Sequence, residues 1–127
     1  MNNDSVTILN DLQRSLVSFF DELIDMFPRE GDFVVIRMMI KDRIPVSTIM
    51  NYFIKTVLPE KASIGSRSES VFLDKNILFS SFGPLRSDNF KKLWIGDNLD
   101  KDDKACIWVW LDTFISLVEK YQKLNKN

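Results

Sequence analysis

The chain contains no histidine, and this absence excludes more chemistry than any other feature of its composition. Without histidine there is no common general base, no Ser-His or Cys-His pair, and no imidazole ligand for zinc. The single cysteine, Cys106, cannot form an intramolecular disulfide or a structural zinc site, and it fits a reducing compartment. We therefore expect no cofactor, no metal site and no enzymatic activity.

Glycine, excess charge and long apolar runs are also scarce. The four glycines, at positions 31, 65, 83 and 96, form neither a P-loop nor a dinucleotide-binding pattern. Seventeen basic and eighteen acidic residues give a net charge of -1, so no overall field attracts nucleic acid or an anionic membrane. No apolar stretch reaches the ~18 residues that a membrane span needs, so we expect no membrane association.

The composition is that of one folded domain over residues 1–127. Apolar residues make up 45% of the chain and charged residues 28%, which is too apolar for disorder. A chain of this size buries roughly two-thirds of its unfolded surface, enough for one core.

Two long segments have the spacing of amphipathic helices. The first carries apolar residues at steps of three and four from Leu9 to Phe27 and stops at Pro28. In the last, Asp100 is expected to cap a helix with acidic residues in its first turn and lysines near its end. We predict an all-α fold, a compact bundle of about five to six helices in which these two flank shorter buried ones.

The middle of the chain predicts those shorter helices. Asp32 is expected to cap a helix over 33–40 that other helices largely surround, although Val-Val-Ile also permits a strand. Further helices are predicted between Pro45 and Pro59, around 71–74, and from a cap at Ser87 or Asp88 to near Gly96. Residues 62–70, rich in serine, predict a flexible internal loop.

Four lysines, Lys91, Lys92, Lys101 and Lys104, form one candidate site. With Phe90 and Trp94 nearby, they are a candidate basic and aromatic patch for single-stranded nucleic acid. Acidic residues lie among them, at positions 97, 100, 102 and 103, so an ordinary mixed-charge surface is the alternative.

The last helix supplies a second candidate site. Trp108 and Ile115 lie together at one edge of its apolar face, which covers more than half of the helix. Either a neighbouring helix covers that edge, or Trp108 is partly exposed as an anchor for a partner chain. Cys106 lies beside the same face, and we interpret it as a packing residue that reacts slowly.

Two blocks of sequence resemble small uncharacterised proteins of large DNA viruses, of the mimivirus and phycodnavirus kind. The blocks are FFDELIDMFPREGD at 19–32 and FKKLW at 90–94, the latter followed by LDKDDK at 99–104 and IWVW at 107–110. The resemblance spans about residues 19–123. It implies work in a host cytoplasm, a viral factory or a virion, and it implies no catalytic residues.

These observations favour protein–protein interaction, as an adaptor, a homo-oligomer or a virion component, over the other classes of function. The alternative is nucleic-acid association in viral replication or transcription through the lysines after Phe90. An enzyme ranks third, because a site without histidine would depend on carboxylate, lysine or tyrosine side chains.

Overall fold

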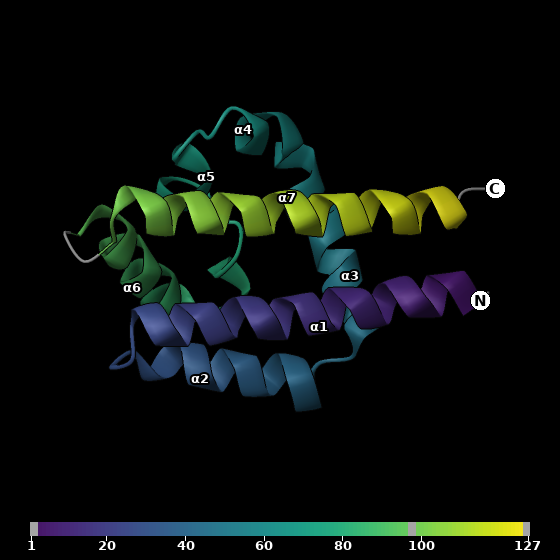
Figure 1. The fold of residues 1–127 in the computed structure, drawn as a ribbon, viewed down its shortest axis with the longest axis horizontal. Helices are drawn as coiled ribbons and strands as arrows, with labels where there is room; N and C mark the ends of the chain where they lie inside the picture. The colour runs from purple at the N-terminus through teal and green to yellow at the C-terminus, as the bar shows by residue number, and fades with distance from the viewer. Residues whose placement is uncertain (1–2, 97–98, 126–127) are drawn as a thin grey trace.

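The two long helices form the frame of the protein. The computed structural model describes residues 3–96 and 99–125, and in it α1 (Asn3–Met26) and α7 (Lys101–Leu124) run antiparallel, side by side (Figure 1). The start of α1 therefore lies near the end of α7, and Asn125 donates a hydrogen bond from Nδ2 to Ser5 Oγ over 3.0 Å. The prediction of an all-α bundle with long first and last helices is confirmed.

The predicted cap of α7 is also confirmed. The Asp100 carboxylate accepts a hydrogen bond from the Asp103 backbone N–H over 2.8 Å. Asp102 and Asp103 lie in the positive first turn and Lys123 lies in the negative last turn, as the helix dipole favours. No helix among the described residues combines the length and apolar character that a membrane span requires.

Helix α2 (Gly31–Met38) lies against α1 at the edge of the molecule (Figure 1). The sequence permitted either a helix or a strand in this segment, and the structure shows a helix. The prediction that other helices surround it is wrong, because α2 buries only Phe33 and Ile36 while Val34, Val35 and Met38 stay exposed. Asp32 lies in the first turn instead of at the cap, which is Glu30.

Two π-helical turns interrupt the next part of the chain. The turn η1 (Met39–Arg43) continues α2, and the turn η2 (Phe53–Val57) continues α3 (Val46–Tyr52). A 3₁₀ turn, η3 (Leu58–Glu60), then leads into α4 (Lys61–Gly65), and α5 (Ser70–Leu73) follows.

The predicted loop at 62–70 is therefore wrong in its first half, where the chain is helical. This segment is attached to α7, because Ile64 is fully buried and Arg67 forms two hydrogen bonds with Asp112. Lys61 adds an ion pair with Glu119 over 2.6 Å. The loop was predicted from the serine content of the segment alone. The contacts that hold the segment in place are made by Asp112 and Glu119, which lie more than forty positions later in the sequence.

A short 3₁₀ turn, η4 (Ser80–Phe82), precedes α6 (Pro84–Ile95). The predicted cap at Ser87 or Asp88 is wrong, because the helix begins at Pro84, whose missing N–H and fixed φ suit a first helical position. Gly83 precedes it at a φ of 100°, a left-handed value that favours glycine. The predicted end near Gly96 is confirmed.

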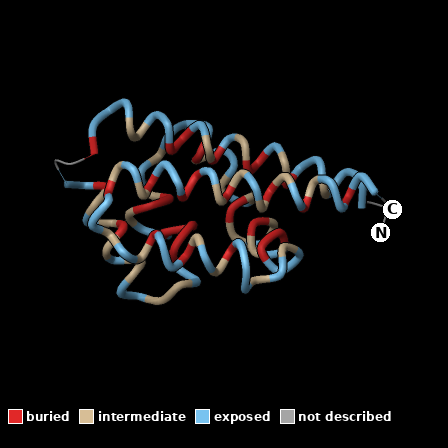
Figure 2. The backbone as a smooth tube through the Cα atoms, turned by 60° about the horizontal axis from the view of Figure 1, so that its bottom comes forward, coloured by how far each residue is buried: buried red, intermediate tan, exposed pale blue. Residues whose placement is uncertain are grey.

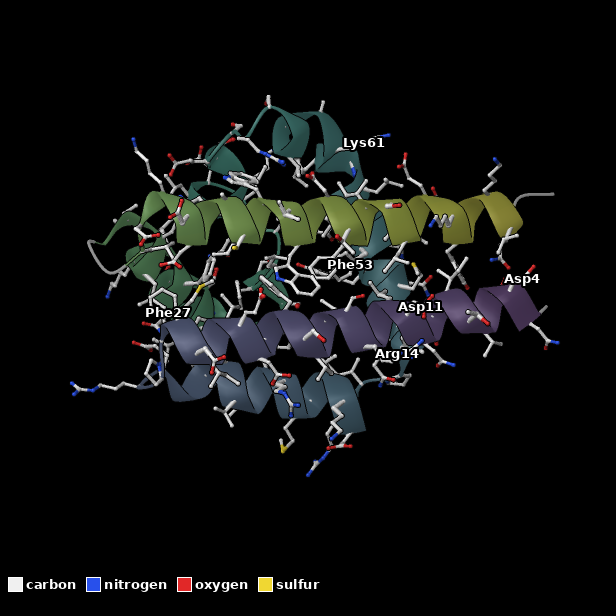
Figure 3. The ribbon with its side chains drawn as sticks, in the orientation of Figure 1. Asp4, Asp11, Arg14, Phe27, Phe53 and Lys61 are labelled. Carbon is white, nitrogen blue, oxygen red and sulfur yellow. The ribbon has the colours of Figure 1, made fainter. Side chains whose placement is uncertain are left out.

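The core is one continuous cluster in which aromatic rings contact one another. Buried residues line the inner sides of the helices, and the outer sides are exposed (Figure 2). Phe114 of α7 meets Phe19 of α1 at a ring distance of 5.5 Å and Phe53 of η2 at 5.6 Å. Phe53 consequently lies between the two long helices (Figure 3).

Candidate functional site

The candidate partner surface at Trp108 and Ile115 is buried, with exposed fractions of 7% and 6%. The Trp108 ring lies 5.0 Å from the ring of Phe72 and 5.6 Å from that of Trp94, and the Arg67 guanidinium lies 5.7 Å from its centre. The interpretation of Trp108 as an exposed anchor is wrong, because the segment from α4 to α5 covers this edge of α7.

The lysine patch is partly engaged within the protein. Lys104 Nζ lies 5.0 Å from the centre of the Trp94 ring and 3.7 Å from Glu69 Oε2. Lys92 and Lys101 are exposed and Lys91 is half-buried, and none of these three pairs with an acidic residue that the structure describes. The neighbouring Asp97 lies outside the described residues.

The interpretation of Cys106 as a packing residue is also wrong, since its side chain is exposed. Viewed along the axis of α7, the buried side chains extend from Ile107 around one side of the helix, through Leu111 and Ile115 to Trp108. Cys106 lies on the other side of Ile107, beside the exposed Val109. Among the described residues, no group of acidic or thiol side chains is placed to hold a metal ion.

An apolar pocket that the sequence did not predict lies on another side of the molecule. Its volume is about 260 Å³, and α1, η1, α3, η2 and the segment 77–82 form its walls. The buried residues at its base are Leu16, Phe19, Phe20, Ile40, Ile49, Phe53 and Leu78. The base therefore consists only of aliphatic and aromatic side chains.

The mouth of this pocket is marked by lining residues that reach solvent. Thr48 and Ser81 are exposed, whereas Met39, Ile44, Tyr52 and Phe82 are half-buried. The lining contains two small hydroxyl groups and one phenol, and it contains no acidic or basic side chain. An apolar cavity with a few polar groups at its edge is the usual composition of a site that binds an apolar group.

Pro45 and Pro59 explain why π-helical turns form part of the pocket walls. In each case the residue before a proline donates to the carbonyl five positions back, Ile44 to Met39 and Leu58 to Phe53. Proline has no N–H to donate and its ring crowds the carbonyl four positions back, so the regular α-helical hydrogen-bond pattern breaks at both positions. Ile44 is extended, whereas Leu58 keeps α conformation and the chain continues into η3. Turns of this type occur frequently at functional sites.

Two side chains attach the pocket walls to one another. Gln13 Nε2 donates to the carbonyl oxygens of Ile40 and Lys41, both over 3.2 Å, where Pro45 offers no backbone donor. The Tyr52 hydroxyl donates to the Ile77 carbonyl and lies 3.1 Å from Ser80 Oγ. These contacts hold the Tyr52 side chain against the segment 77–82.

Comparison of the chain with protein-family models, with curated proteins and with solved structures finds no match. The pocket and the charges around it are therefore the features that bear on function.

Proposed function

We propose that the protein is a non-enzymatic binding protein that recognises a protein partner by enclosing one of the partner's apolar side chains in this pocket. The observation that carries the proposal is the lining, which is apolar at its base, open to solvent at its mouth and free of charged side chains. Binding energy at protein interfaces is concentrated in a few such anchor side chains that fill well-packed apolar pockets.

The volume of the pocket supports a side chain as its occupant. A cavity of roughly 150 Å³ lined by similar residues takes up one benzene ring. At about 260 Å³, this pocket has space for one large aromatic or aliphatic side chain. At the mouth, the exposed hydroxyls of Thr48 and Ser81 can form hydrogen bonds with the backbone of the partner.

The sequence resemblance to proteins of large DNA viruses suggests where such a partner acts. We propose that it is a viral protein or a host protein in the cytoplasm, the viral factory or the virion. The lone cysteine and the absence of disulfides fit the first two of these settings.

Filling the mouth of the pocket tests the proposal. Thr48→Trp places an indole at an exposed lining position, whereas Ser47→Trp adds the same group at the neighbouring exposed position outside the lining. Both variants should fold, because substitutions at exposed positions usually change stability by less than about 0.5 kcal/mol. Proteins recovered from native cells with the wild-type chain should be retained by Ser47→Trp and lost by Thr48→Trp. Equal recovery by the two variants would contradict the proposal.

Nucleic-acid association through Lys91, Lys92 and Lys101 is the second candidate, because these lysines have no ion-pair partner among the described residues. Its test is a salt titration with mixed oligonucleotides, since binding through phosphate contacts weakens steeply as salt rises. No binding at low salt would exclude this candidate.

A further inference from the structure

Three cations lie on the helical turns that form walls of the pocket. Lys41 and Arg43 belong to η1, which also supplies Met39 and Ile40 to the lining, and Lys55 belongs to η2. All three side chains are exposed, and none forms an ion pair with any residue in the described ranges. Their charges are therefore available to a partner.

The helical register places two of these cations beside the lining. Arg43 follows Met39 by one turn, and Lys55 follows Tyr52 by three positions. Both Met39 and Tyr52 are half-buried residues of the mouth. The long side chains of arginine and lysine can therefore extend over the rim of the opening.

The acidic residues nearby do not neutralise this charge. Asp42 is the only acidic residue between positions 39 and 57. On α1, Asp11 pairs with Arg14 over 2.5 Å, and Asp21 pairs with Arg37 over 2.6 Å. Asp11 and Arg14 lie one turn apart along that helix (Figure 3). The segment 77–82, which forms the opposite wall, carries no charge, so the mouth is left with an excess of positive charge.

We infer that the partner presents an acidic segment, in which the apolar side chain that enters the pocket is flanked by Asp or Glu residues. This inference rests on the proposed function. Complementary charges at the edge of an interface raise the association rate and select the partner, while the apolar anchor provides affinity. Arg43 is well suited to this role, since guanidinium binds carboxylate through two parallel hydrogen bonds.

The test uses three short fluorescein-labelled peptides that share a central tryptophan. The tryptophan is flanked by glutamates in the first peptide, by glutamines in the second and by lysines in the third. At low salt, the glutamate peptide should bind the wild-type protein at least about tenfold more tightly than the lysine peptide, with the glutamine peptide between them. The difference should shrink as salt screens the exposed charges.

Charge reversal at the mouth identifies the residues responsible. The double variant Arg43→Glu/Lys55→Glu should reverse the order of the three peptides. The control Lys120→Glu/Lys123→Glu changes the net charge equally near the end of α7, and it should preserve the wild-type order.

The outcomes separate this inference from the proposed function. If all three peptides bind equally and Thr48→Trp abolishes their binding, the acidic partner is refuted and the pocket remains the binding site. If no peptide binds, or if Thr48→Trp has no effect on binding, both are refuted. A preference for glutamate that survives the Arg43→Glu/Lys55→Glu change would also refute the inference, because the charges would lie elsewhere.

Discussion

At the scale of single residues, α7 shows how a helix with a wide apolar face packs against α1 on one side and against the segment from α4 to α5 on another, while a third side stays exposed. Trp108 is buried against Phe72 and Trp94, whereas Val109, the next residue, is 59% exposed. On the other side of α7, Trp110 is half-buried and donates from Nε1 to Glu22 of α1. Truncating different side chains of α7 should therefore change the free energy of unfolding by very different amounts.

Trp108→Ala should lower the free energy of unfolding by about 3–5 kcal/mol, because it leaves a cavity in the aromatic cluster. The control Val109→Ala should change it by less than about 0.5 kcal/mol, as is usual for exposed positions. Urea unfolding followed by circular dichroism measures both values. Equal stability of the two variants would show that Trp108 is not part of the core.

Cys106 should react quickly with a thiol reagent in the native protein, because its side chain is exposed. The control is the same reaction in denaturant, where the thiol is fully accessible. We expect the two rates to be similar at neutral pH. Native labelling that is slower by orders of magnitude would place the thiol in the interior.

At the scale of elements, the segment from α4 to α5 is joined to α7 by one bidentate pair. Arg67 donates to the two carboxylate oxygens of Asp112 over 2.9 and 2.8 Å, and also to the Ile64 carbonyl. Arg67 has a φ of 59°, which is uncommon for a residue other than glycine. The hydrogen bond from Arg67 holds the pKa of Asp112 below its ordinary value.

This pKa shift predicts how the contribution of Asp112 to stability depends on pH. Because the folded-state pKa is the lower one, the contribution is fully present above the unfolded pKa of about 4 and is lost as pH falls through the folded-state value. Asp112→Asn should thus be less stable than wild type at pH 7, by at most about 1 kcal/mol for so exposed a pair. The two proteins should converge in acid. A difference in stability that persists unchanged at the lowest pH would contradict the shift.

The elements that sequence periodicity predicts are those whose pattern is complete within one segment. Apolar steps of three and four identified α1 and α7, and Asp100 identified the start of α7. The prolines at 45 and 59 bounded the helix between them, yet their effect on hydrogen bonding, which creates the π-helical turns, was not predicted. The helix at 61–65 was missed because contacts with α7 determine it.

At the scale of the whole molecule, the pocket arises only when α1, residues 39–53 and the segment 77–82 meet. Phe20 and Phe53 lie on two different helical segments, and Leu78 lies on a third stretch of the chain. No local pattern reveals that these side chains leave a space between them. The candidate site at Trp108 was instead chosen from one helix, and the four lysines were chosen from two helices that follow one another in the sequence. In the structure, Trp108 and Lys104 are engaged in contacts between helices.

The most direct test of the pocket as a binding site is an NMR titration of the isotope-labelled protein with indole, which represents an apolar side chain. The methyl signals of Ile40, Ile44 and Ile49, which line the pocket, should shift in a saturable manner, and Thr48→Trp should abolish these shifts. The exposed Ile95 on α6 serves as the internal control and should not shift. Unperturbed signals from the three lining isoleucines, or shifts confined to Ile95, would contradict a pocket that accepts an apolar side chain.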